Sequence, residues 1–501
     1  MKTKSKKLFY LFVLIVLMPL SLISNNHNEP NENNVLEIND ISANEVTNFG
    51  TIYNLDVLYG YYYFTSGGKT DNGSYESEIK IYDLDLKYNK SIKIETIKKA
   101  GLVQVIFNGN AFLVTLLGAK GNDLHTYSKE GQFLGEKKEL NKNSQMSYFT
   151  MGNFGFLKRE THRKGKKFSY VLQAYNNKLE LLWSDETGGN TSYSEGVDIK
   201  YTSSEFIGII KEQSSGGVLK REIKRSYYFI DSKSGKKLIE MDYEKIKDLI
   251  INSCRVDEVN KFIYIVGEYY NLGSFNSEGL CLMKLNFDGN VINEKRLSWF
   301  NNLREITTIS EGKEKINNIS LFIHNIHWGN DDNLYIVAEQ YKSFPKSGID
   351  ANLLAGMSGG AMSTMIFNIV YMVFDKDFTS IRNDVVKKRY LNTDATSYAN
   401  IPNLATGFLL KSYFDYKFSY SNYDGKAISI IFEDSKEEDM AKIKIIRSVD
   451  FNITGVTYRS INLQLKQNEM KILPAKNNHI IFLEYNVLRR KLIVKMETLN
   501  L

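Results

Sequence analysis

The sequence is poor in proline, cysteine and histidine. Its 501 residues include 5 prolines, 2 cysteines and 6 histidines, and its 34 glycines are an ordinary share for this length. Fibrous repeats and proline- or glycine-rich disorder are therefore excluded. With 43% hydrophobic and 24% charged residues, the composition is that of a globular protein with a large core.

The two cysteines, Cys254 and Cys281, are expected to be free, buried thiols. The sequence between them reads as one intervening strand, which would place them two strand spacings apart, or roughly 9–10 Å. The Cα atoms of a disulfide lie within about 7 Å of each other. A disulfide is the alternative that their spacing in the chain leaves open.

Helical periodicity is also nearly absent, and the one candidate helix is Tyr243–Ile251. From Ile52 onward, short segments alternate between apolar and polar residues, as in 79–86, and turns such as Asp288-Gly289 separate them. Glycine at these turns supplies the positive φ that a tight hairpin needs. Many short strands without intervening helices predict an all-β fold.

Two segments look like copies of one strand–turn–strand unit. The first joins FIYIVGEYY (262–270) to LCLMKLNFDGNVI (280–292), and the second joins LYIVAEQY (334–341) to IVYMVFDKDFTSI (369–381). Looser copies along the chain predict a β-propeller-like repeat of antiparallel four-stranded units, with about six to eight blades, over residues 45–501. The alternative is two β-sandwich or small propeller modules.

The charge-free run 353–374 is best explained as two adjacent elements. Its second half, IFNIVYMVF, is expected to be a strand buried on both faces, and its first half belongs to an inserted Gly/Met-rich loop at about 343–364. Three glycines interrupt the run, so no transmembrane span is expected in the mature chain. Candidate partner contacts on this pliable apolar loop are Leu353, Leu354, Met357 and Met362. The alternative is a loop that packs over a blade or plugs the central channel.

The N-terminus has the pattern of a secretory signal peptide. Residues 1–24 combine four lysines, a short apolar stretch and small residues near the exit, and 25–44 reads as a flexible polar leader. The protein is therefore expected to be exported to the periplasm, the cell surface or the medium, with an uncleaved N-terminal membrane anchor as the alternative. Loss of 1–24 removes four lysines and no acid, so the net charge falls from +6 to +2. This balance gives no support for a nucleic-acid partner.

Several of these segments resemble a known group of proteins. The stretches YYYFTSGGKTDNGSYESEIKIYDLDLKYNKSIKIE (61–95) and FLVTLLGAKGNDLHTYSKEGQFLGEKKE (112–139), with the VGEYY and VAEQY units, resemble exported Bacteroidetes-type proteins of unknown function. The resemblance implies propeller-like β repeats and transfers no catalytic residue.

Two short motifs are weak candidates for chemistry. Residues 356–360 match the G-x-S-x-G pattern of hydrolases, but one histidine alone, His479, follows Ser358, and a flexible loop is the better interpretation. His324 and His327 form H-x-x-H in a segment that alternates like a strand, so one is expected to point inward and the other outward. No metal site and no cofactor is expected.

The carboxylates offer one enzymatic alternative. The repeat places Glu268 and Glu339 at the same point, just beyond an apolar strand, where they are expected to cap backbone N–H groups. Alternatively, they act as paired carboxylates of a carbohydrate-active hydrolase or lyase. The acidic stretch 433–439 is expected to be a solvated loop. The leading hypothesis is a monomeric, non-enzymatic binding or scaffold protein of the cell envelope, with an envelope protein or a glycan as its partner.

Overall fold

The computed structural model describes residues 35–498 apart from the segments 40, 42–44, 46–47, 55–56, 118–120, 141–143, 165–166, 187–193, 218–219, 242–245, 272–276, 312–313, 318, 330–331, 346–360, 389–391, 399–413, 422–426, 439–440, 453–454, 463–469 and 477–478. The predicted signal peptide lies outside the described residues. Within them, no helix has the length and apolar character that crossing a membrane requires.

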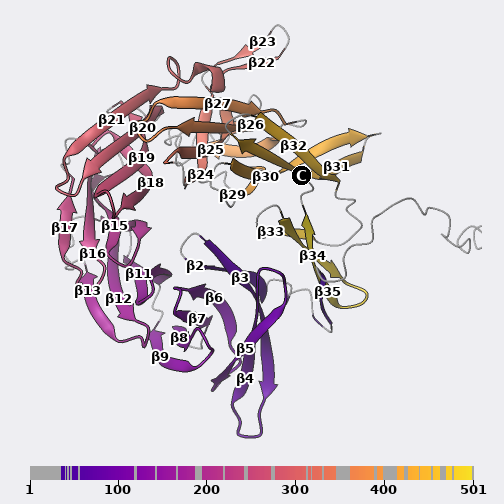
Figure 1. The fold of residues 1–501 in the computed structure, drawn as a ribbon. Helices are drawn as coiled ribbons and strands as arrows, with labels where there is room; N and C mark the ends of the chain where they lie inside the picture. The colour runs from indigo at the N-terminus through magenta and orange to yellow at the C-terminus, as the bar shows by residue number, and fades with distance from the viewer. Residues whose placement is uncertain are drawn as a thin grey trace, which may run out of the picture.

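The described strands form eight four-stranded antiparallel units, which we number blades 1 to 8 (Figure 1). A single parallel bridge, Asn54↔Phe107, joins the first two units into one eight-stranded sheet. The strands of blades 1 to 4 are β2 (Phe49–Asn54), β3 (Val57–Lys69), β4 (Tyr75–Tyr82) and β5 (Tyr88–Thr96); β6 (Gly101–Phe107), β7 (Ala111–Leu117), β8 (Gly121–Ser128) and β9 (Phe133–Leu140); β10 (Ser144–Met151), β11 (Gly155–Lys164), β12 (Lys167–Asn176) and β13 (Leu181–Glu186); and β14 (Ser194–Thr202), β15 (Phe206–Gly217), β16 (Lys220–Asp231) and β17 (Lys237–Glu240).

The strands of blades 5 to 8 are β18 (Leu249–Asp257), β19 (Phe262–Tyr270), β20 (Ser277–Asn286) and β21 (Val291–Ser298); β24 (Ser320–Trp328), β25 (Leu334–Pro345), β26 (Ala361–Phe374) and β27 (Ser380–Val386); β29 (Tyr416–Ser421), β30 (Ala427–Glu438), β31 (Ala441–Asn452) and β32 (Gly455–Asn462); and β33 (Met470–Pro474), β34 (His479–Asn486), β35 (Lys491–Thr498) and β1 (Val35–Ile38). A 3₁₀ turn (Arg304–Ile306) and a small hairpin of β22 (Ile309–Glu311) and β23 (Glu314–Ile316) connect blades 5 and 6, and β28 (Asn392–Tyr398) pairs with β26.

The blades are arranged in a ring around a central axis, with the first strand of each blade innermost (Figure 1). Blade 8 takes its fourth strand from the other end of the chain, because β1 pairs with β35 in antiparallel register from Val35↔Lys495 to Ile38↔Leu492. Val35–Ile38 is therefore a strand, although the sequence places it in the polar leader. This is the fold of a β-propeller, and the predicted all-β class and blade range are confirmed.

The core of the protein lies between blades. Apolar clusters fill each interface from blade 8 through blade 1 to blade 7, and the cluster between blades 8 and 1 contains residues from both ends of the chain, such as Phe49, Tyr61, Leu483 and Val494. Blades 1 to 6 therefore each bury both faces against their neighbours. Central strands such as β26 thus lack a solvent-facing side, which accounts for the absence of charge in the part of the run from Ala361 to Phe374.

The proposed repeat is confirmed residue by residue. Ile265 pairs with Met283 in blade 5, and Ile336 pairs with Met372 at the equivalent place in blade 6. Gly289, in the turn after β20, has a φ of 79°, which is the left-handed backbone that this hairpin position requires.

Three other expectations concern local structure. Of the helix predicted for Tyr243–Ile251, 243–245 lies outside the described residues and Ile246 is helical, but Leu249–Ile251 already begins β18, where Leu249 and Ile251 face the core between blades 4 and 5. The acidic stretch is also not a loop, because 433–438 continues β30 and Asp434 is buried. Both cysteines are free and buried, as predicted, with β19 between their strands.

The inserted loop is shorter than predicted. Ser343–Pro345 still belongs to β25, and 361–364 already belongs to β26, with Pro345 opposite Met362. Cross-strand pairing holds these residues in the hairpin despite their glycine- and methionine-rich context.

Candidate functional site: the central cavity

The inner strands of blades 4 to 7 share a β-bulge at the same position. In each strand one residue is skipped in the pairing with the second strand of the blade, and the four skipped residues are Lys200, Asn252, His324 and Lys417. A bulge adds a residue to one strand and re-aims its side chain. Here the bulges bring four polar side chains to the ring interior.

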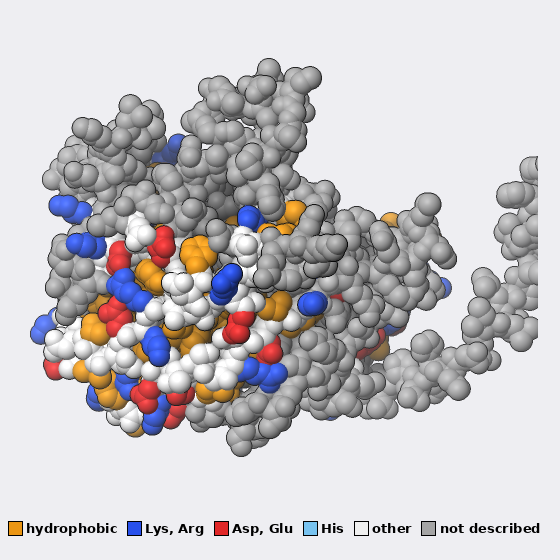
Figure 2. Space-filling view, turned by 90° about the horizontal axis from the view of Figure 1, so that it is seen from above, with side chains coloured by type: hydrophobic (Ala, Val, Ile, Leu, Met, Phe, Trp, Pro, Cys, Tyr) orange, Lys and Arg blue, Asp and Glu red, His pale blue; other side chains and the backbone are white. Residues whose placement is uncertain are grey.

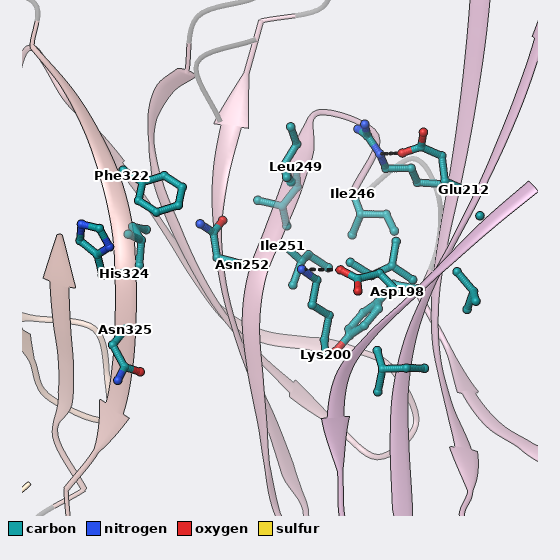
Figure 3. Close-up of a pocket in the computed structure, with 18 of the residues that line it drawn as sticks. Asp198, Lys200, Glu212, Ile246, Leu249, Ile251, Asn252, Phe322, His324 and Asn325 are labelled. Carbon is teal, nitrogen blue, oxygen red and sulfur yellow. Dashed lines mark hydrogen bonds and ion pairs between the residues drawn. The ribbon is translucent and has the colours of Figure 1, made fainter. Parts of the chain in front are cut away.

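All four bulge residues line one cavity of about 960 Å³. Its walls come from β14, β18, β24 and β29, with contributions from β15 and β16. Asn252 and Phe322 line it from β18 and β24, the inner strands of blades 5 and 6 (Figure 3). Ligand sites in proteins occupy about 300–1,000 Å³ and combine apolar surface with a few placed polar groups. The cavity therefore has the size and lining of a ligand site.

Charged side chains of the cavity are held in ion pairs. Asp198 contacts Lys200 at 2.8 Å, and Glu212 contacts Arg225 at 3.0 Å (Figure 3). Asp198 also contacts Arg159 of blade 3 at 3.0 Å. Asp198 and Lys200 lie two residues apart on β14, and Glu212 lies opposite Arg225 across β15 and β16. These contacts fix the positions of the charged side chains. Acidic and basic groups therefore balance along this wall.

Three of the bulge residues face a glutamate on the second strand of their own blade. The glutamates Glu268, Glu339 and Glu433 occupy equivalent positions, opposite Ile250, Phe322 and Asp415 respectively. In blade 7, Lys417 Nζ contacts Glu433 Oε1 at 3.2 Å. In blade 6, His324 Nε2 lies 3.0 Å from Glu339 Oε2.

Glu339 is the centre of a buried ionic cluster between blades 6 and 7. Lys388 Nζ donates to Glu339 Oε1 at 2.7 Å and to Asp415 Oδ2 at 2.6 Å, and the side chains of Lys388 and Glu339 are both 0% exposed. The backbone N–H groups of Asp415 and Tyr416 donate to the two Glu339 oxygens at 3.2 and 3.3 Å. Glu339 thus joins strands of two blades.

The cluster fixes the charge states of its members. Burial by itself raises the pKa of the Glu339 carboxyl, but the Lys388 ammonium and the His324 imidazole outweigh it and hold that pKa well below its usual value of 4.5. Burial would lower the pKa of Lys388, yet Glu339 and Asp415 raise it overall. Glu339 and Lys388 are therefore an ion pair at neutral pH.

Glu268 has a different environment in blade 5. Its side chain is 1% exposed, and its hydrogen-bonding neighbours are the neutral side chains of Ser277, Tyr270 and Asn252. Tyr270 donates to Oε2 at 3.2 Å, whereas Oε1 has no partner among the described residues. Burial raises the pKa of this carboxyl to about 7, against the lowering effect of the three neighbours.

The structure corrects the predicted positions of Glu268 and Glu339. They lie inside β19 and β25 rather than beyond the end of a strand, because both strands continue past them. The expectation that the glutamates bind backbone N–H groups describes Glu339, whose partners are in the next blade.

The prediction that His324 and His327 point to opposite faces is wrong. His324 is the extra residue of the bulge, so the alternation slips by one position and both rings face blade 7. His324 stacks on Tyr416 with ring centroids 4.4 Å apart, and His327 Nε2 lies 2.8 Å from Ser419 Oγ. Burial lowers the pKa of His327 to about 4. Among the described side chains, no group of three or more His, Cys, Asp or Glu could hold a metal ion.

One of the four predicted partner-contact residues, Met362, lies among the described residues. Leu353, Leu354 and Met357 lie outside the described residues, and Met362 pairs with Pro345 and Ser397 in the hairpin of blade 6. Sequence reasoning also missed Lys388, Asp415 and Glu433. Glu433 was detectable in principle as a third glutamate after a buried strand, but Lys388 and Asp415 are distant in sequence from Glu339.

Fold and cavity together define an eight-bladed β-propeller with a ligand-sized cavity at the inner strands of blades 4 to 7. By sequence, the chain belongs to the Family of unknown function (DUF6770), whose profile matches residues 11–500. No curated protein matches it in sequence.

Solved structures with a similar arrangement include the WD40 domain of SCAP from fission yeast, at 9% identity and a TM-score of 0.38 over 93% of this chain and 98% of that one. Prolyl oligopeptidase B from Galerina marginata is similar at 8% identity and a TM-score of 0.37, over 86% of this chain and 56% of that one. An uncharacterised protein from Listeria monocytogenes is similar at 9% identity and a TM-score of 0.37, over 79% and 94%. Because these TM-scores are below 0.5, the propeller assignment rests on the sheets of this chain.

Proposed function

We propose that this protein is an exported, non-enzymatic β-propeller that binds a glycan of the cell envelope in its central cavity. The observation that carries the proposal is the cavity of about 960 Å³ into which four successive blades direct a bulge residue. Export is expected from the basic and apolar pattern of residues 1–24.

The lining suits a polar ligand with apolar faces. Phe322 and Tyr416 supply aromatic surface, and Asn252 supplies an amide, a group that both donates and accepts hydrogen bonds. Pyranose rings present the same combination of hydroxyl groups and apolar C–H faces. On the described part of the face in Figure 2, acidic, basic and hydrophobic side chains are interspersed, so a highly charged polymer is not the favoured partner.

The surroundings of Glu339 favour binding over acid–base catalysis. Its two oxygens accept hydrogen bonds from Lys388 and from two backbone N–H groups, and one of them lies next to the His324 ring. The pKa of its carboxyl lies below the usual range. A general acid needs a raised pKa and access to the substrate. The paired-carboxylate hydrolase or lyase is retained as an outcome of the experiment.

The test is calorimetric titration of residues 25–501 with neutral di- to tetrasaccharides, combined with product analysis. Ile250→Trp places a bulky ring at a residue that lines the cavity, and it should weaken binding at least about tenfold. The matched control is Ile292→Trp, at an exposed residue on the outer strand of the same blade.

Equal affinity of Ile250→Trp and the control would refute the cavity as the site, as would the absence of binding by any sugar of the panel. Formation of cleaved sugar, lost in Glu268→Gln and Glu339→Gln, would instead establish the enzymatic alternative.

A further inference from the structure

The three equivalent glutamates differ in what compensates their charge. Glu433 has Lys417, and Glu339 has Lys388 and His324. Glu268 has Asn252 at the bulge position instead of a lysine or histidine.

The residue of blade 5 that is equivalent to Lys388 is also uncharged. Val386 opposes Ile369 in blade 6, and Leu297 opposes Leu280 in blade 5, so Trp299 takes the place of Lys388 two residues later. The indole N–H of Trp299 donates to Ser277 Oγ at 2.9 Å. Blade 5 thus preserves the carboxyl and replaces both of its cationic partners.

Among the described residues, the groups that face Glu268 come from four strands and are uncharged at neutral pH. They are Asn252 on β18, Tyr270 on β19, Ser277 on β20 and Tyr341 on β25 of blade 6. Burial and Glu268 itself raise the pKa of Tyr341 well above its usual value, so this phenol stays neutral. An ionised Glu268 therefore has no countercharge among these groups.

Two acceptor oxygens in this cluster are buried without a partner among the described residues. They are Glu268 Oε1 and Asn252 Oδ1, which belong to hydrogen-bonding neighbours. Leaving a buried acceptor unpaired is unfavourable, and two acceptors cannot satisfy each other. A proton on Glu268 would supply a donor for such an acceptor, whereas the Asn252 amide N–H favours the ionised carboxyl and lowers its pKa.

Asn252 connects this cluster to the cavity, because it also lines the cavity wall (Figure 3). Its amide has one accepting end and one donating end, so whichever end bonds to Glu268 leaves the other for a ligand. We propose that Glu268 is a proton-binding site that sets which end of the Asn252 amide faces the cavity, and thereby which ligand groups the cavity binds.

The two states follow from hydrogen-bond direction. With Glu268 protonated, its O–H donates to Asn252 Oδ1, and Nδ2 is available to a carbonyl or ether oxygen of the ligand. With Glu268 ionised, it accepts from Asn252 Nδ2, and Oδ1 is available to an N–H or O–H donor. The raised pKa of Glu268 puts the exchange near neutral pH. This inference rests on the proposed function, since it names the ligand groups recognised in the same cavity.

The test has a part that needs no ligand. Difference infrared spectra of ligand-free residues 25–501 should show a protonated-carboxyl C=O band that titrates near neutral pH and is missing in Glu268→Gln. A spectrum in which every carboxyl titrates in the ordinary range, or one that Glu268→Gln leaves unchanged, overturns the proton site.

The second part uses N,N′,N″-triacetylchitotriose, which has acetamido carbonyls and no titrating group near neutrality. Its affinity for the wild type should fall about tenfold from about pH 5.5 to about pH 8.5, as one hydrogen bond of the ligand is lost. Glu268→Gln, whose amide donates permanently to Asn252 Oδ1, should keep the low-pH affinity throughout. Asn252→Leu should abolish the pH step while the infrared band remains.

The control is Glu484→Gln in blade 8, whose side chain is 29% exposed and pairs with Lys495, and it should show the wild-type step. A trisaccharide affinity independent of pH in the wild type overturns the proposed exchange. Absence of trisaccharide binding at any pH counts against the proposed function, and the infrared band then decides the proton site by itself.

Discussion

Replacing Lys388 should test whether the ionic cluster between blades 6 and 7 stabilises the ring. Lys388→Met keeps the length of the side chain and removes the ammonium that contacts Glu339 at 2.7 Å and Asp415 at 2.6 Å. Both Lys388 and Glu339 are 0% exposed, so no solvent replaces the lost partner.

Removing one partner of a buried ion pair costs about 3–5 kcal/mol, because the other charge stays buried. The lower end applies here, since Glu339 keeps His324 and two backbone donors, and Asp415 is 21% exposed. We therefore expect a loss of about 3 kcal/mol in the free energy of unfolding at neutral pH.

The assay is urea unfolding followed by tryptophan fluorescence, with Lys417→Met as the matched control. Lys417 and Glu433 form the equivalent pair of blade 7 but are 31% and 29% exposed, so that variant should lose less than about 1 kcal/mol.

The effect should depend on pH with a defined sign. The folded-state pKa of Glu339 lies below its usual value of 4.5, so the pair stabilises the fold above that pH, and this contribution is lost as the pH falls below it. The difference between wild type and Lys388→Met should therefore shrink on acidification. The reasoning is refuted if Lys388→Met costs no more than Lys417→Met, or if the difference stays constant into the acid range.

Three further predictions concern the closure, the thiols and the inserted segment. The double variant Leu36→Ala, Ile38→Ala removes half-buried side chains that pack on the cluster between blades 8 and 1, and it should lower the free energy of unfolding by about 2 kcal/mol. Glu37 is exposed, so Glu37→Ala should leave the free energy of unfolding nearly unchanged. Equal effects of the two changes would contradict closure of the ring by β1. Cys254 and Cys281 should react with a thiol reagent only on unfolding, because both are buried and burial raises the pKa of each to about 12; labelling of the folded protein would contradict this. Deleting 350–360 should leave the urea midpoint unchanged, because the β25–β26 pairs from Pro345↔Met362 inward are retained. The same deletion should weaken retention of the protein on isolated cell envelopes, if Leu353, Leu354 and Met357 contact a partner there. A lower urea midpoint would show that the segment packs on the propeller.

The sequence alone determined the local and repeating features. Alternation and turn chemistry predicted strands, and the two copies at 262–292 and 334–381 predicted equivalent pairs, such as Ile265↔Met283 and Ile336↔Met372, because side-chain period and hairpin length are local properties. The charge-free run was interpretable for the same reason, since a strand between two blades has no solvent face. Glu268 and Glu339 were identified as equivalent by the repeat.

Tertiary structure decided what those residues do. A bulge shifts alternation by one residue without a clear sequence mark, so the common orientation of His324 and His327 was not predictable from period two. Lys388 and Asp415 reach Glu339 from 49 and 76 positions away, and only the packing of adjacent blades brings them together. The same packing gives Glu339 a cation, whereas the described neighbours of Glu268 are uncharged. The chemical character of two otherwise equivalent carboxyls is thus a property of their neighbours in space.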